Sequence, residues 1–193
     1  SPALRQKLLN GEIDILIDGC AVTDSSMESR EILEENLLLV TPSRLGMRNE
    51  YRPYLLRPDV ARSMDEKDWN YLPVEYAKEI LREPILSFRQ GSDLYNRITS
   101  LLNQYNVQTK ILLEFEQVSS CIDYIEEGLG ASLLPSTPFF YRHRRYDVCL
   151  FALKAEGIAR RQKIIWRKGR YHPRAMDLFI EMTERCLKNE YNK

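Results

Sequence analysis

The sequence predicts an α/β fold, because two neighbouring stretches each read as strand, helix, strand. Residues 110–135 (KILLEFEQVSSCIDYIEEGLGASLLP) combine a short apolar run, a polar turn with helix-capping hydroxyls, apolar residues at helical spacing and a second apolar run closed by proline. Residues 84–110 repeat this order, with a Gly-Ser turn after the first run. Such units are parallel and right-handed, so both helices should begin at one edge of a sheet. Helix N-termini attract anions, so this edge is a predicted ligand site.

The composition is that of a globular protein with one domain or two small lobes. Of 193 residues, 44% are hydrophobic and 29% are charged. No apolar run reaches the length of a membrane span and residues 1–6 lack a signal-peptide pattern, so we expect a cytoplasmic protein with no membrane partner. The four cysteines are widely spaced and there are two histidines, which predicts reduced, mostly buried thiols and neither a metal nor a cofactor.

The net charge is zero, but it is unevenly distributed along the chain. Residues 1–138 hold 14 basic and 22 acidic side chains, whereas 139–193 hold 14 basic and 6 acidic ones. A basic end of this kind could contact nucleic acid. Because no recognition-helix pattern accompanies it, we favour a solvated face that is balanced by the acidic remainder.

In the N-terminal part, the sequence predicts a helix that ends at Asn10-Gly11, a strand over 13–17 and a second strand over 36–40. Asp14 interrupts the first strand and needs a structural partner if it is buried. A polar stretch through Arg30 separates the two strands. Residues 43–72 alternate arginines with aromatic side chains and hold several prolines. They could form a nucleic-acid surface, but a partly helical excursion over the protein surface is favoured.

The remaining elements follow from apolar spacing. We expect a helix over 74–81, a buried strand over 84–88, a helix from Ser92 as N-cap to about residue 105, and a buried strand from residue 111. After Pro135, residues 139–141 form a short helix or loop, and 148–153 and 162–166 are strands. His172 and Pro173 open a final amphipathic helix whose shared face contains Met176, Phe179, Ile180, Thr183 and Leu187.

The order of several motifs resembles the effector-binding domain of LysR-type transcriptional regulators. They are LNGEIDILI at 9–17, ENLLLVTP at 35–42, PILSF at 84–88 with Gly91-Ser92, GLGASLLP at 128–135, and the terminal helix. Each motif alone is common in α/β proteins, whereas their joint order over most of the chain is fairly specific. In the family, a strand, a helix and a second strand precede the GEIDILI motif, and we expect them to be missing here. The segment 43–72 is longer than the family's usual connection.

The resemblance implies a type 2 periplasmic-binding-protein-like fold, with two α/β lobes joined by two crossover strands. One lobe would contain residues 1–83 and 161–193, and the other 84–160. A small, often anionic effector would bind in the cleft between them. The family's binding positions correspond here to three groups, Gly19 and Cys20, then Gln90, Gly91 and Ser92, then Gln117, Val118 and Ser119.

The predicted function is effector sensing without catalysis. The resemblance implies that DNA is bound only through a winged helix-turn-helix domain outside this sequence, and that the protein is a homodimer or homotetramer, with the helix after Ser92 in the interface. An alternative is an extracytoplasmic solute-binding protein of the same fold. A third hypothesis is an enzyme that uses Cys121 or Asp123, since a thiol in the first turn of a helix can have a lowered pKa. No histidine is near Cys121 in sequence, which argues against catalysis.

Overall fold

The computed structural model describes residues 2–19, 22–61, 63–140, 146–171 and 173–191. They form two compact units, unit 1 (Ser1–Glu35 with Arg160–Lys193) and unit 2 (Asn36–Ala159). The chain passes from one unit to the other within strand β2 (Met27–Pro42) and again at the start of strand β7 (Ala159–Arg167). This division differs from the lobes expected from sequence, because residues 36–83 group with unit 2. The physical reason is that the C-terminal half of β2 pairs with strands of unit 2.

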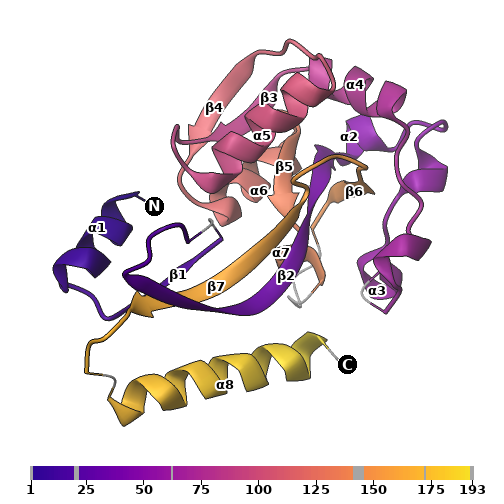
Figure 1. The fold of residues 1–193 in the computed structure, drawn as a ribbon. Helices are drawn as coiled ribbons and strands as arrows, with labels where there is room; N and C mark the ends of the chain where they lie inside the picture. The colour runs from indigo at the N-terminus through magenta and orange to yellow at the C-terminus, as the bar shows by residue number, and fades with distance from the viewer. Residues whose placement is uncertain (1, 20–21, 62, 141–145, 172, 192–193) are drawn as a thin grey trace. The chain divides into compact units, whose positions relative to one another are not determined.

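Unit 1 is a small sheet with one helix on each face. It contains the N-terminal half of β2, β7, α1 (Pro2–Asn10), β1 (Ile15–Asp18) and α8 (Arg174–Tyr191). The sheet order is β1-β7-β2, and β1 is antiparallel to β7. Ile164 and Ile165 are fully buried neighbours in β7, so their side chains point to opposite faces. Ile165 packs against Leu8 of α1, whereas Ile164 packs against Met176 of α8. Helices α1 and α8 accordingly lie on opposite sides of this sheet (Figure 1).

Unit 2 is built around the C-terminal half of β2. Its elements are α2 (Ser43–Gly46), η1 (Arg52–Tyr54), α3 (Pro58–Ala61), η2 (Glu66–Asp68), α4 (Val74–Arg82), β3 (Ile85–Phe88), α5 (Asp93–Gln104), β4 (Ile111–Phe115), α6 (Val118–Glu126), β5 (Ser132–Pro135), α7 (Thr137–Phe140) and β6 (Val148–Ala152). Strands β5 and β6 pair with β2, both antiparallel. Strand β3 pairs in parallel with β4, and a parallel bridge between Ile85 and Ala131 links β3 to the start of β5. The predicted parallel arrangement of the three strands β3, β4 and β5, which α5 and α6 connect, is therefore confirmed.

The segment 43–72 is partly helical and mostly exposed, as expected, but a few of its side chains are anchored in the core of unit 2. Tyr51 is fully buried, and its hydroxyl donates a hydrogen bond of 2.8 Å to Glu79. Its ring also packs edge-on against Phe151. Trp69 is buried against Phe140, and its indole Nε1 donates to the carbonyl of Ala61 at 3.3 Å. The sequence showed Tyr51 and Trp69 as part of an alternation of arginines and aromatic residues, but it did not indicate that they are buried.

Strand β4 was expected to be buried and is instead half exposed. Ile111, Leu112 and Leu113 have exposed fractions of 40%, 38% and 39%. Among the described residues the strand pairs with β3 alone, so in this part of unit 2 it is an outer strand with one open edge. An apolar run alone does not distinguish an outer strand from a central one.

Several element boundaries differ from the sequence prediction. Strand β2 begins at Met27, inside the stretch expected to be a polar connection. Its acidic residues Glu31 and Glu34 form ion pairs with Arg161 of the neighbouring strand β7. Asp14 precedes β1 instead of interrupting it, so its carboxylate is exposed. In α8, Met176 and Ile180 are buried as expected, whereas Phe179 is 45% exposed.

The basic residues of β7 are balanced by acidic residues of β2. Arg161 Nε lies 3.5 Å from Glu34 and Arg161 Nη1 lies 3.9 Å from Glu31, and Lys163 Nζ lies 3.4 Å from Glu31. This agrees with the favoured interpretation of this part of the basic end as a balanced face. Arg142, Arg144 and Arg145 lie outside the described residues. Within the described part, no helix is both long and apolar enough to cross a membrane.

Candidate functional site

The polar turns that follow β3 and β4 lie side by side in unit 2. The two strands are parallel and in register at their C-terminal ends, where Phe88 is paired with Phe115. Just beyond this pair, the backbone N–H of Arg89 donates to the carbonyl of Phe115 at 3.0 Å. The Arg89 guanidinium also lies 2.7 Å from the carboxylate of Glu116. The starts of α5 and α6 are thus held at one edge of the β3–β4 pair, as the sequence predicted.

The first turn is ordered by the N-cap of α5. The hydroxyl of Ser92 accepts a hydrogen bond from the backbone N–H of Tyr95 at 3.2 Å, which confirms Ser92 as the cap. Gln90 and Gly91 are exposed, and Gly91 has a φ of 82° with no atom within 4 Å of where a Cβ would stand. The turn therefore presents backbone and an amide side chain to its surroundings.

The second turn leaves the start of α6 uncapped. Its N-cap residue is Gln117, and no side chain accepts a hydrogen bond there. Gln117 and Ser119 are exposed and Val118 is half-buried. Ser119 lies in the first turn of α6 rather than at the cap position, so it does not cap the helix. The first N–H groups of a helix have no intrahelical acceptor, so this edge can donate hydrogen bonds to an anion.

The remaining predicted position, Gly19, lies in unit 1 directly after β1. It is buried, and the Nε of Arg160 lies only 2.7 Å from where a Cβ on Gly19 would stand, so a larger residue would displace the arginine. The preceding Asp18 forms an ion pair of 3.5 Å with Arg5. Cys20, its predicted companion, lies outside the described residues.

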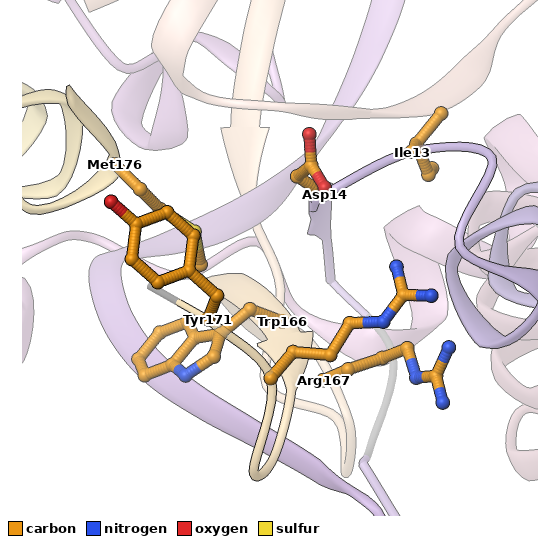
Figure 2. Close-up of a pocket in the computed structure, with 7 residues that line it drawn as sticks. Ile13, Asp14, Trp166, Arg167, Tyr171 and Met176 are labelled. Carbon is orange, nitrogen blue, oxygen red and sulfur yellow. The ribbon is translucent and has the colours of Figure 1, made fainter. Parts of the chain in front are cut away.

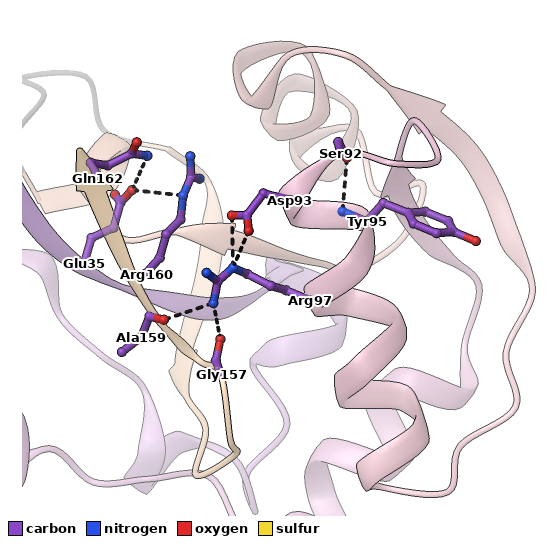
Figure 3. A network of polar contacts seen from close by, with 9 residues as sticks. All are labelled: Glu35, Ser92, Asp93, Tyr95, Arg97, Gly157, Ala159, Arg160 and Gln162. Atoms are coloured by element: carbon purple, nitrogen blue, oxygen red, sulfur yellow. Dashed lines mark hydrogen bonds and ion pairs between the residues drawn. The ribbon is translucent and has the colours of Figure 1, made fainter. Parts of the chain in front are cut away.

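Sequence reasoning missed two polar networks (Figure 3). In unit 2, Arg97 pairs with Asp93 at 2.9 Å, and its Nη1 donates to the carbonyl of Ala159 at 3.0 Å. In unit 1, Glu35 accepts from Gln162 at 3.2 Å and lies 3.8 Å from Arg160. The pair four residues apart in α5 was recognisable from spacing. The network around Glu35 joins residues more than a hundred positions apart and left no local signal.

The buried thiols are unsuited to nucleophilic catalysis. Burial raises the pKa of Cys121 to about 12, although the thiol lies in the first turn of α6. Burial likewise raises the pKa of Cys149 to about 11. Cys121, Cys149 and Cys186 are free, and the first two are buried, as expected. Among the described residues, no group of three potential metal ligands comes together.

A small pocket in unit 1 contains Asp14 (Figure 2). Its volume is about 20 Å³, and its lining includes Asp14, Trp166, Arg167 and Tyr171. This space holds about one water molecule. Asp14 makes no hydrogen bond or ion pair with another described residue, so the expected structural partner is absent from the described part of the chain.

Comparisons with known proteins give a consistent result. The family model of the LysR substrate binding domain matches residues 71–187. The chain is 22% identical over 178 residues to YusT of Bacillus subtilis strain 168, an uncharacterized HTH-type transcriptional regulator, covering 92% of this chain and 50% of the relative. It is 30% identical over 76 residues to YofA of Bacillus velezensis, also an HTH-type transcriptional regulator, covering 39% of this chain and 26% of the relative. The chain therefore spans half or less of the length of these relatives.

Solved structures show the same architecture. The regulatory domain of CcmR from Synechocystis PCC6803, in complex with 2-PG, aligns with a TM-score of 0.69 and 15% identity over 97% of this chain and 79% of that one. The effector binding domain of QuiR, in complex with shikimate, aligns with a TM-score of 0.66 and 17% identity over 98% of this chain and 78% of that one. The fold is the type 2 periplasmic-binding-protein-like fold. With more than half of its residues matched by the family model, the chain belongs to the family of LysR substrate-binding domains.

Proposed function

We propose that this chain is the effector-sensing module of a transcriptional regulator. The observation that carries the proposal is the pair of turns before α5 and α6, which are fixed side by side while the start of α6 stays uncapped. Family membership and the regulators among the relatives support the same conclusion. The relatives reported above are transcriptional regulators, which argues against the alternative of a solute-binding protein.

The ligand is proposed to be a small organic anion. Backbone N–H groups at the start of α6, the exposed amide of Gln117 and the turn at Gln90 and Gly91 would bind its charged end. The relatives' solved complexes contain 2-PG and shikimate, which supports a small-molecule ligand of this size class. As the family resemblance implies, Gly19 and Cys20 would also contact the ligand.

The mechanism is a shift between two arrangements of the lobes. A ligand changes their balance only by the difference in its affinity for each arrangement. The shift would be transmitted to a winged helix-turn-helix domain outside this sequence, in a cytoplasmic homodimer or homotetramer. The module by itself is proposed to bind no specific DNA and to catalyse no reaction.

Isothermal titration calorimetry against a panel of small organic anions tests the site. Ser92→Asp retains an N-cap acceptor but adds a negative charge, so the helix should persist while anion affinity falls by about tenfold or more. Ser119→Ala removes an exposed hydroxyl and should weaken binding by about 1 kcal/mol. Ser100→Ala, at an exposed position farther along α5, serves as the control and should bind like the wild type.

One result would contradict the proposed anion site at the turns before α5 and α6. If Ser92→Asp and Ser119→Ala both bind the identified anion with unchanged affinity, the ligand does not contact the turns before α5 and α6. Circular dichroism of each variant separates a lost ligand contact from a lost helix.

A further inference from the structure

A second cavity lies at the opposite end of β3 from the turn at Ser92. Its volume is about 300 Å³, within the range of small-molecule sites. It lies wholly in unit 2, between the end of β2, helix α2, the start of β3 and the turn after α6. Its lining residues are Pro42, Arg44, Leu45, Arg48, Glu83, Pro84, Gly128, Leu129 and Gly130.

Two of the segments that line this cavity, those with Pro84 and Gly130, are closely packed backbone. A Cβ on Gly130 would lie 2.5 Å from the carbonyl oxygen of Pro84, so only glycine fits where these two segments cross. Just beyond, the backbone N–H of Leu86 donates to the carbonyl of Ala131 at 2.8 Å. The cavity is therefore built on two segments that are fixed against each other.

Charges of both signs line the cavity, and none of them forms an ion pair with another residue that the structure describes. The Arg44 guanidinium donates to the carbonyl of Gly128, at the C-terminal end of α6. Arg48 lies over the Tyr51 ring, 5.8 Å from its centroid, and approaches the Tyr51 hydroxyl at 3.4 Å. Neither arginine forms an ion pair with a described carboxylate, and the exposed Glu83 carboxylate has no partner among the described residues.

This combination selects for a ligand that also carries both charges. A simple anion would meet the unpaired carboxylate of Glu83, and a simple cation would meet two guanidinium groups, so each would be repelled by part of the lining. A zwitterion can place its carboxylate on Arg48 and its ammonium on Glu83. The side chains of Leu45 and Leu129, with Pro84, supply apolar surface for the rest of the molecule.

We propose that this cavity binds a small zwitterion, namely an α-amino acid with an apolar side chain. Arg48 binds the α-carboxylate, Glu83 binds the α-ammonium group, and Leu45 and Leu129 contact the side chain. This site is separate from the turns before α5 and α6, so it goes beyond the proposed function and does not depend on it.

The test uses L-leucine and two analogues, each lacking one of its charged groups, titrated into the whole chain by calorimetry. We expect L-leucine to bind, and both 4-methylpentanoate and 3-methylbutylamine to bind at least about tenfold more weakly. Arg48→Met keeps an unbranched stem over Tyr51 and Glu83→Gln keeps the shape of the side chain, so both should fold. Each should weaken L-leucine binding by at least about tenfold.

Matched controls separate this site from general charge effects and from the proposed effector site. Arg82→Met and Glu75→Gln change exposed residues of α4 outside the cavity and should bind L-leucine like the wild type. Ser92→Asp should also leave this binding unchanged. The proposal is overturned if L-leucine does not bind at millimolar concentration, or if 4-methylpentanoate binds as well as L-leucine. It is likewise overturned if Arg48→Met and Glu83→Gln bind like the wild type, or if only Ser92→Asp loses binding.

Discussion

Single residues determine how closely the segments of unit 2 approach one another. Gly130 permits contact with the Pro84 carbonyl, and Gly91 permits a left-handed turn before α5. Gly91 lies in the Gly-Ser turn and Gly130 in the GLGASLLP motif, and the structure shows a different reason for glycine at each position. At Gly130 the constraint is space, whereas at Gly91 it is backbone conformation.

This difference predicts two unequal losses of stability. Gly130→Ala places a methyl group against fixed backbone and should lower the free energy of unfolding by about 2 kcal/mol or more. Gly91→Ala meets no atom and should cost about 1 kcal/mol through its positive φ alone. Urea denaturation followed by circular dichroism measures both. Equal losses would contradict the steric explanation.

The cysteines give a second prediction from burial. At pH 8, iodoacetamide should modify exposed Cys186 in the native protein, whereas Cys121 and Cys149 should stay unmodified because they are buried and their pKa values are raised. All three should react in urea, which serves as the control. Mass spectrometry identifies the modified sites, and native modification of Cys121 at the rate of Cys186 would contradict the structure.

The same pKa shifts predict a dependence of stability on pH. Each buried thiol keeps its proton in the folded state to a higher pH than in the unfolded chain, where the ordinary pKa is 9.0. Their contribution to stability is therefore fully present below pH 9 and decreases as the pH rises toward 11. Denaturation midpoints at pH 8 and pH 10 measure this decrease, with Cys121→Ala as a comparison that lacks one of the two contributions.

Among the elements, β4 exposes more apolar surface than its sequence indicates. Its three half-exposed apolar side chains and its open edge are features that proteins usually cover. We propose that β4, together with α5, contributes to the subunit contact of the expected homodimer. The apolar run revealed that a strand was present, but its neighbours are decided by tertiary packing.

A charge in β4 should therefore weaken subunit association. Leu112→Glu should move the protein from dimer toward monomer in light scattering, with little loss of folding stability because the side chain is already 38% exposed. Val60→Glu, at a similarly exposed position in α3, should leave the oligomeric state unchanged. A monomeric wild type, or a dimer unaffected by Leu112→Glu, would contradict this proposal.

In the whole molecule, the sequence predicted the order of helices and strands better than their distribution between the two units. Helix α5, its cap at Ser92 and the paired turns followed from local spacing, because they depend on residues close in sequence. The assignment of residues 36–83 to a unit did not follow from local spacing, because β2 is one continuous strand whose two halves pair in different units. The burial of Tyr51 likewise depends on Glu79 and Phe151, which no local pattern connects to it.

The chain has two tryptophans, one in each unit, so tryptophan fluorescence can report on the state of each unit separately. Trp69 is buried in unit 2, whereas Trp166 is half-buried in unit 1, where its indole donates to Glu28 at 3.0 Å. In a Trp166→Phe variant all tryptophan emission would come from unit 2, and in a Trp69→Phe variant all of it would come from unit 1. Emission spectra of the two variants during denaturation would then show whether the units unfold in one transition or in two.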